Sequence, residues 1–450
     1  MSFDRGRLSA LLAREAEAFA AARPQSRALY DRATGALLGG VPMPWMMAWA
    51  GGFPVFAREA AGARIVDVDG HEYVDLCLGD TGAMPGHGPP VVLEALAAQA
   101  ARGITTMLPT EDAIWVGEEL SRRFGMARWL FTLTATDANR TALRLARQLT
   151  GRPMVVVFSY CYHGSVDEAF AVAGDDGATH SREGNVGPPV DPALTTRAIE
   201  FNDPEALEAA LADGLVACVL AEPAMTNMGI ILPEPGYHER LRELTRAAGT
   251  LLIIDETHTF SAGPGGCTAA WGLEPDMLTI GKAIGGGIPS GALGLSDALA
   301  GSLLGDPDAD YEDTGGVGGT LAGNALSAAA MRATLEHVLT HEAFAHTIPL
   351  AERFAAGVEG VIAGHGLPWH VTQLGCRAEY AFSAPPPRDG TSAHAAADHE
   401  LERYLHLHAL NRGVMITPFH NMALMSPATS AADVDRHTEV FGEAVGELLA

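Results

Sequence analysis

The sequence predicts an α/β protein in which a large domain with a mainly parallel, doubly wound sheet is joined by a smaller α+β domain formed by both chain ends. Short apolar runs alternate with helical patterns in the middle of the chain, which is typical of a parallel sheet covered by helices. A hairpin pattern precedes this alternation, and the chain of 450 residues is longer than one ordinary domain. We expect an N-terminal part of the small domain at residues 1–78, the large domain at 79–335 and the C-terminal small domain at 336–450.

The first predicted element is a β-hairpin at Ala63–Leu78. Apolar and polar residues alternate on both sides of Asp69 and Gly70, and an Asp-Gly pair is a strong signal for a hairpin turn. Later elements follow from apolar runs of strand length and from helical periodicity. The predicted strands are Arg128–Thr132, Met154–Phe158, Leu215–Ala221 and Thr250–Asp255, and the predicted helices are Ala138–Thr150, Pro235–Ala248 and Ala325–Leu339.

Charge and cysteine content argue against several classes of function. The formal net charge of -26 would repel phosphate backbones and anionic lipids, so nucleic-acid and membrane partners are not expected. The five cysteines are odd in number and lack a CxxC pair, which indicates reduced thiols and no metal site. The N-terminal segment lacks the apolar run of a signal peptide, and no uncharged apolar stretch reaches about 18 residues. We expect a cytoplasmic protein.

Lys282 is the first candidate for chemistry. It lies in TIGKAIGGGIPSGALG, Thr279–Gly294, after an apolar run and before three glycines that would let a flat cofactor approach the amine. On spacing alone, a solvated loop lysine is an equally good interpretation. Lys282 is the only lysine in the chain, however, and a surface role would not require that exception.

Asp255 is the second candidate, because four apolar residues deliver it to the end of a strand in LLIIDETHT, Leu251–Thr259. Ligands bind at the carboxyl ends of strands in open α/β sheets, and a carboxylate there could keep a pyridine nitrogen protonated. Such a ring is the electron sink that carbanion chemistry requires. If Asp255 stood alone, an aspartate that caps the next segment would be as good an interpretation.

The third candidate is a hydroxyl-rich turn, TLTATDANR, at Thr132–Arg140. Backbone amides at a helix N-terminus, together with the hydroxyls of Thr134 and Thr136 on either side of Ala135, would bind a phosphate group. An ordinary N-cap is the alternative.

Eight ordered segments between Asp67 and Asn324 resemble the class III aminotransferases, which are fold type I enzymes that use pyridoxal 5'-phosphate (PLP). The chain looks most similar to the branch that includes glutamate-1-semialdehyde aminomutase and the β-amino-acid aminotransferases. The segments are DVDGHEYVDL, GHGPPVV, the turn at Thr132–Arg140, YCYHG at Tyr160–Gly164, AEPAMTNMG at Ala221–Gly229, DETHT, the segment around Lys282 and GGTLAGN at Gly318–Asn324.

The resemblance implies a role for each matching residue. Lys282 would form the Schiff base with PLP, and Asp255 would pair with the pyridine nitrogen. Tyr162 would stack on the ring and Asn227 would bind the phenolic oxygen, although core packing or turn capping would also explain these two. Thr320 would reach the phosphate from the neighbouring subunit, which implies a homodimer with shared sites.

Further positions support this cofactor site. Glu222 matches an acidic residue of the family, and Thr257 stands where a β-branched residue packs under the ring. His163 and His258 flank cofactor residues, so His163 is included with the cofactor-binding residues, but a structural histidine is the simpler expectation for both. Ala135 replaces a glycine that is usual in the phosphate turn and restricts the backbone there.

The substrate side departs from the family pattern. Relatives in this branch carry a carboxylate-binding arginine where this chain has GVPMPWMMAW, which places Trp45 and Met46 there. Arg377, on a predicted strand at Gly375–Phe382, could replace it, although a pair with Glu379 is at least as good an interpretation. We therefore expect an apolar or aromatic substrate pocket, unless the Met/Trp segment packs in the core or at a dimer interface.

The function expected from these features is transamination between an amine or amino acid of apolar or aromatic character and a keto acid, through a Lys282 Schiff base. The alternative is an aminomutase, racemase or decarboxylase on the same scaffold, because these enzymes share the Lys–Asp pair. The missing arginine counts against glutamate-1-semialdehyde as the substrate. A ligand sensor without catalysis is less expected, since no DNA-binding segment precedes Val41.

Overall fold

The computed structural model describes residues 3–305 and 317–450. The chain divides into two compact units, each with its own core. The small unit contains the chain up to Pro89, residues 342–386 and residues 396–450, and the large unit contains residues 90–341 and 387–395. These bounds differ from the predicted ones at residues 78 and 335, and the return of residues 387–395 to the large unit was not expected.

The large unit is built on a seven-stranded sheet with the order β4-β12-β11-β10-β9-β5-β8. All of its strands run parallel except β12, which is antiparallel to β11 and β4. The strands are β4 Arg128–Thr132, β5 Met154–Phe158, β8 Thr196–Ile199, β9 Val216–Ala221, β10 Leu251–Asp255, β11 Met277–Ile280 and β12 Gly291–Leu295. This mixed α/β sheet confirms the predicted fold class.

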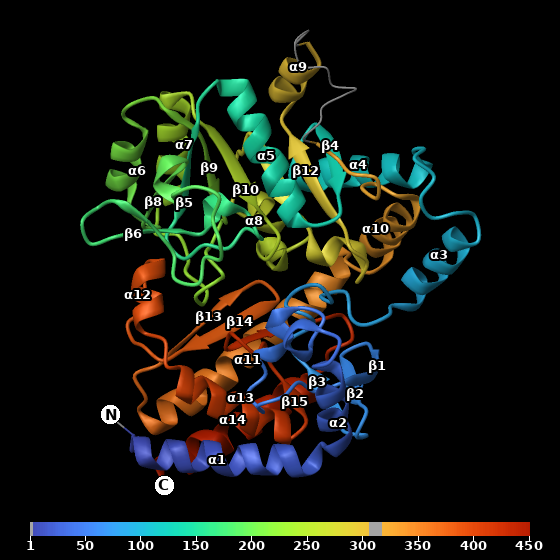
Figure 1. Cartoon of the computed structure of the whole chain (residues 1–450), viewed down its shortest axis with the longest axis vertical. Helices are drawn as coiled ribbons and strands as arrows, with labels where there is room; N and C mark the ends of the chain where they lie inside the picture. Colours follow the sequence, from blue (N-terminus) through green and yellow to red (C-terminus); the bar gives the residue numbers. More distant parts are fainter. Residues whose placement is uncertain (1–2, 306–316) are drawn as a thin grey trace. The chain divides into compact units, whose positions relative to one another are not determined.

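Helices surround this sheet, and Figure 1 shows α5, α6 and α7 beside its strands. The helices of the large unit are α3 Pro90–Ala100, α4 Glu111–Phe124, α5 Ala135–Thr150, α6 Pro204–Leu211, α7 Tyr237–Ala248, α8 Gly266–Ala270, α9 Asp297–Gly305, α10 Ala325–His337 and α12 Gly390–Ala395. A short hairpin, β6 Ala171–Ala173 with β7 Thr179–Ser181, extends from the unit. Strand β9, VACVLA, is buried along its whole length because helices cover both faces of a parallel sheet.

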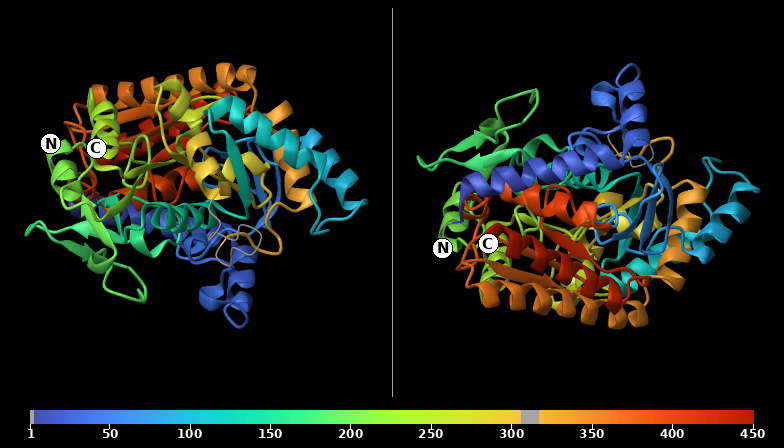
Figure 2. Two further views of the ribbon diagram at one scale, coloured as in Figure 1. Left: turned by 90° about the horizontal axis from the view of Figure 1, so that it is seen from above. Right: turned by 90° about the horizontal axis from the view of Figure 1, so that it is seen from below.

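The small unit has two sheets, with the orders β1-β2-β3-β15 and β13-β14-β16. Their strands are β1 Ala57–Ala61, β2 Arg64–Asp67, β3 Glu72–Asp75, β13 His370–Leu374, β14 Arg377–Ala381, β15 Val414–Met415 and β16 Met422–Leu424. The antiparallel pairing of β2 with β3 confirms the predicted hairpin. The α-helices are α1 Arg5–Ala22, α2 Pro24–Ala33, α11 His341–His365, α13 His399–Asn411 and α14 Ala431–Leu449, and α1 packs along α13 (Figure 2).

The five cysteines are all buried and free, as expected. Across residues 3–305 and 317–450, no helix combines the length and the apolar character that a membrane span requires.

Candidate active site

The predicted cofactor residues of the large unit gather at one edge of its sheet. Asp255 ends β10, and Lys282 follows β11. Thr134, Tyr162 and Asn227 follow β4, β5 and β9, which run in the same direction. Since the carboxyl ends of parallel strands lie at one edge of a sheet, these five segments form one group.

Asp255 is the centre of a buried hydrogen-bond network. His163 Nδ1 lies 2.9 Å from its Oδ2, and Asn139 Nδ2 donates to the same oxygen at 2.8 Å. The backbone N–H of Thr257 donates to Oδ1 at 3.0 Å. Burial by itself would raise the pKa of Asp255, but His163, Thr257 and Asn139 outweigh it and lower the pKa to about 2. The carboxylate is therefore ionised at neutral pH.

His163 carries the opposite charge. Burial disfavours a charged imidazole, but the neighbouring Cys161 and Asp255 side chains outweigh that effect and raise the pKa of His163 well above its usual range. Asn139 holds the pair in place, because it also donates to the backbone oxygen of His163 at 3.1 Å and accepts from Thr279 Oγ1 at 2.6 Å. Thr279 is the partner of Asp255 in the β10–β11 register. From the sequence we expected a structural role for His163, and its contact with Asp255 was not predicted.

The hydroxyl-rich turn forms the N-terminus of α5. Thr134 is the N-cap, and its hydroxyl accepts from the backbone N–H of Asp137 at 3.3 Å. Ala135 and Thr136 begin the helix, where the backbone amides of the first turn have no partners within the helix. Ala135 does not adopt a positive φ, so the glycine that it replaces is not required. The turn has the donors that an anion such as phosphate requires.

Two glycines bring neighbouring segments against this turn. A Cβ on Gly164 would lie 2.0 Å from Thr136 Oγ1, and Gly164 has a φ of 78°. A Cβ on Gly281 would lie 3.0 Å from both the N and the Cβ of Ala135. Gly164 follows His163 and Gly281 precedes Lys282, so these close contacts join the phosphate turn, the His163–Asp255 pair and the lysine into one site.

Lys282 begins the 3₁₀ turn η6, Lys282–Gly285, with a φ of 50°. Its Nζ lies 2.7 Å from Nε2 of His258, and both side chains are half-buried. A positive φ is unusual for a residue with a side chain, and residues in such conformations cluster at functional sites. The only lysine of the chain is therefore held in a specific conformation next to a histidine.

The other predicted cofactor residues make local contacts. Tyr162 is half-buried with its ring edge-on to Phe170 at 6.3 Å, and Asn227 Nδ2 donates to the backbone oxygen of Tyr160 at 2.8 Å. Glu222 is buried and accepts from Thr226 Oγ1. Thr257 is buried, and its Oγ1 has no hydrogen-bond partner among the described residues.

The structure gives less support to the remaining positions. Thr320 is exposed. Trp45 and Met46, on η2 Pro44–Met47 of the small unit, are 43% and 42% exposed, and the Trp45 ring packs against Phe419 at 5.6 Å. Arg377 is fully buried in the small unit with Nη2 3.6 Å from Glu379 Oε2, which is the pairing considered as its alternative. Their roles toward cofactor and substrate stay predictions.

Two polar residues of the site, Asn139 and Thr279, were not predicted from the sequence, and neither was the contact of His258 with Lys282. A signal existed for Asn139, because it lies on the apolar face of α5 beside Ala138 and Ala142. A buried amide on such a face requires polar partners. The contact of His258 with Lys282 depends on the β10–β11 register, which the sequence does not specify.

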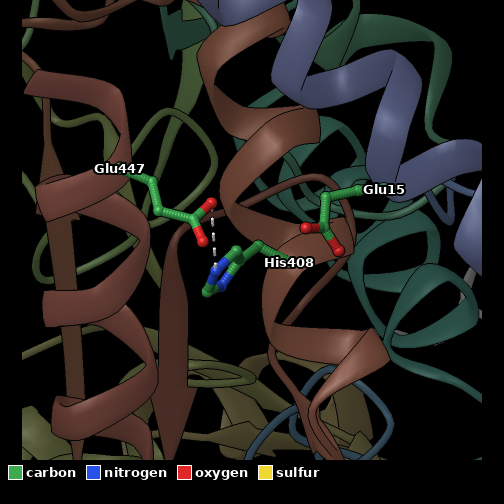
Figure 3. A group of neighbouring side chains, drawn as sticks. All are labelled: Glu15, His408 and Glu447. Atoms are coloured by element: carbon green, nitrogen blue, oxygen red, sulfur yellow. Dashed lines mark ion pairs between the residues drawn. The ribbon is translucent and has the colours of Figure 1, made fainter. Parts of the chain in front are cut away.

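A second polar cluster lies in the small unit. Glu15 of α1, His408 of α13 and Glu447 of α14 place possible metal ligands within 4.8 Å of one another (Figure 3). Arg412 donates to Glu15 at 3.1 Å, and Arg14 donates to both carboxylates. A cation would have to displace these guanidinium groups, so the cluster is better explained as an ion-pair network between three helices.

The site in the large unit fits PLP. A buried carboxylate that stays ionised suits a protonated pyridine nitrogen, and the N-terminus of α5 suits a phosphate. Lys282, at the same sheet edge, has the amine that a Schiff base would require. Fold and site together are those expected of an α/β enzyme of the Schiff-base class.

Comparison with known proteins identifies the family. The family model described as Aminotransferase class-III matches residues 46–445. The chain belongs to this family, and the PLP expected from the sequence agrees with that membership.

Named relatives give further detail. A glutamate-1-semialdehyde 2,1-aminomutase of Sorangium cellulosum is 35% identical over 430 residues, which cover 94% of this chain and 96% of that protein. The crystal structure of a glutamate-1-semialdehyde-aminomutase from Pseudomonas aeruginosa is 50% identical over the whole of both chains, with a TM-score of 0.97, and a variant with a lysine replaced by alanine was solved in complex with PMP. An omega-transaminase from Sphaerobacter thermophilus is 29% identical, with a TM-score of 0.87 over 94% of this chain and 98% of that one.

These relatives correct the predicted reaction. Transamination of apolar or aromatic amines is wrong as the main function, because relatives that are 34%, 35% and 50% identical to this chain are named as aminomutases. The alternative of an aminomutase fits better. The motifs could not separate the two, since both reactions use the same Lys–Asp machinery and differ in the substrate pocket.

Proposed function

We propose that this protein is a PLP-dependent glutamate-1-semialdehyde 2,1-aminomutase. The observation that carries the proposal is the 50% identity, over the full length of both chains, with the Pseudomonas aeruginosa protein of that name. The similarity to the Sorangium cellulosum enzyme across 94% of the chain supports it independently. The reaction exchanges the positions of an amino and an oxo group within one molecule, so it requires no keto acid.

The residues of the large unit suit this chemistry. PLP, when bound, supplies an aldehyde carbon for amines and a ring that withdraws electrons from a neighbouring carbanion. Asp255, ionised and fixed by His163 and Asn139, would hold the proton on the ring nitrogen. The Nζ of Lys282 would hold the cofactor and, once released, would carry a proton between substrate carbon atoms.

The proposal includes a homodimer with shared active sites, in which Thr320 reaches the cofactor phosphate of the partner subunit. Support comes from the match of GGTLAGN with the family pattern and from the exposure of Thr320. Mixing two inactive variants tests the arrangement. Lys282→Ala and Thr320→Val subunits should regain activity when combined, because each mixed dimer contains one site with both residues intact.

A direct assay tests the reaction. Purified holoenzyme with glutamate-1-semialdehyde as the sole substrate should form 5-amino-4-oxopentanoate without any keto acid. Lys282→Ala serves as the control for uncatalysed rearrangement of the semialdehyde. Product that appears only after a keto acid is added would show that the amino group leaves the molecule, and would overturn the proposal.

A further inference from the structure

The close contact between Lys282 and His258 gives the amine a titratable neighbour. Nζ of Lys282 lies 2.7 Å from Nε2 of His258, which is a hydrogen-bond distance between two nitrogen atoms. His258 lies three residues beyond the end of β10, and Lys282 lies two residues beyond the end of β11, the parallel neighbour of β10. The register of the two strands therefore brings the side chains together.

The turn that carries His258 is anchored on its other side. Glu256 is fully buried, and its carboxylate accepts from Thr259 Oγ1 and from the hydroxyl and backbone N–H of Thr268. The preceding residue, Asp255, is fixed by hydrogen bonds from Asn139 and from the backbone N–H of Thr257. With residues 255, 256 and 257 all held by hydrogen bonds, the direction of His258 toward Lys282 is set by the fold.

The chemistry of an amine explains what this contact can do. A lysine ammonium group has no free electron pair, and its usual pKa of about 10.4 keeps most lysines protonated at neutral pH. An imidazole with its proton on Nδ1 offers a lone pair at Nε2. When Nε2 takes a proton from the ammonium, the N–H bond at Nζ breaks, its electron pair stays on Nζ, and the imidazolium can release the proton to water because His258 is half-buried.

We propose that His258 is the proton partner of Lys282: it accepts the proton that Nζ must lose before it bonds to the cofactor, and it returns a proton when Nζ is released. The hydrogen bond to His258 also fixes the direction in which Nζ points. This inference rests on Lys282 as the cofactor lysine and not on which substrate the enzyme uses. Its failure and that of the aminomutase proposal are therefore distinguishable.

The test measures bond formation between Lys282 and PLP without any substrate. PLP is mixed with apo-protein at pH 7, and the reaction is quenched with borohydride at successive times. Mass spectrometry of the peptides then counts the cofactor fixed to Lys282, which is unambiguous because the chain has no other lysine. The affinity for PLP before bonding is measured separately with Lys282→Ala and the double variant Lys282→Ala/His258→Gln, which cannot form the bond.

His258→Gln keeps a side-chain amide that can hydrogen-bond Nζ but cannot accept a proton. We expect bonding to slow by about 10²-fold or more, as for the loss of a general base, with the affinity for PLP unchanged. His258→Ala should be equally slow and should be accelerated by added imidazole. His180→Gln is the matched control, because His180 is an exposed histidine that pairs with Asp176 on the surface.

Two results would overturn the proposal. One is a His258→Gln protein that bonds PLP as fast as the unchanged enzyme, since hydrogen bonding alone would then suffice. The other is a His258→Ala protein that added imidazole does not accelerate. Circular dichroism and thermal melting identify variants that do not fold, and His258→Asn replaces the glutamine variant in that case.

Discussion

Nδ1 of His163 and Oδ2 of Asp255 lie 2.9 Å apart with both side chains buried, at the carboxyl edge of the parallel strands. The same separation occurs on the surface between His180 and Asp176, whose side chains are 52% and 62% exposed. Both pairs join a histidine nitrogen to an aspartate oxygen at the same distance, but they differ in burial and in the further hydrogen bonds that Asp255 accepts. Their comparison shows what the buried setting adds to an ion pair.

We expect His163→Gln to destabilise the apo-protein by about 3–5 kcal/mol, because Asp255 would remain buried without its cationic partner. His180→Gln should change stability little, as is usual for an exposed pair. Urea unfolding near pH 6 is the measurement, since the raised pKa of His163 and the lowered pKa of Asp255 keep both groups charged there. Equal losses in the two variants would contradict the assigned charges.

Asp255→Asn should leave PLP bound and lower turnover by about 10²- to 10³-fold, because a neutral amide cannot hold the ring nitrogen protonated. Cofactor retention after dialysis and steady-state rates measure the two effects. His163→Gln/Asp255→Asn should be more stable than His163→Gln alone, because the double variant has no unpaired buried carboxylate. The comparison separates the effect of the carboxylate on turnover from its effect on stability. Near-normal turnover in Asp255→Asn would mean that the carboxylate does not serve the ring.

Lys282→Ala should abolish both turnover and borohydride-stable attachment of PLP to a side chain, because no other lysine can substitute. Peptide mass spectrometry after reduction is the measurement. Lys282→Arg keeps the positive charge and provides the control for electrostatic binding of the phosphate. Cofactor fixed elsewhere in the Lys282→Ala chain, with activity retained, would refute the assignment.

Acid should destabilise the protein in part through His437 on α14. Burial and the neighbouring His406 lower the pKa of His437 to about 3, whereas the unfolded chain has a value near 6.5. The neutral imidazole therefore contributes stability above pH 6.5 that is lost as the pH falls toward 3, with a loss of about 2–3 kcal/mol at pH 4.5. His437→Phe keeps ring contacts with Phe354 and Phe441 but cannot titrate, so unfolding measured at pH 7 and 4.5 should show a smaller acid loss.

The sequence predicted most of the strands and helices that depend on local sequence pattern. The strand Arg128–Thr132 and the strand Met154–Phe158 match β4 and β5, because apolar runs bounded by turn residues specify buried strands. Strand β12 was missed, since its glycines have low strand propensity. They are required by packing: a Cβ on Gly291 would lie 2.5 Å from Thr132 Oγ1, and one on Gly294 would lie 2.7 Å from Met126 Cγ.

The main residues of the candidate site were proposed from the sequence, but the contacts between them were not. Lys282 and Asp255 stood out because of their residue type and their place after apolar runs. The partners Asn139, Thr279 and His258 depend on strand register and on a turn fixed by buried hydrogen bonds, and such relations between distant segments have no local pattern. The choice between intramolecular and intermolecular amino transfer depends on pocket shape, which no motif encodes.

The chain leaves the large unit at residue 341, returns to it for residues 387–395 and leaves again. Within that return, a Cβ on Gly390 would lie 2.0 Å from the backbone oxygen of Ser159, and Arg388 pairs with Glu234 at 3.0 Å. No single cut therefore yields a complete large unit. Chimaeras made with related enzymes should exchange the α12 segment together with residues 90–341, because a junction placed only at the two outer boundaries would combine α12 from one parent with its contact surface from the other.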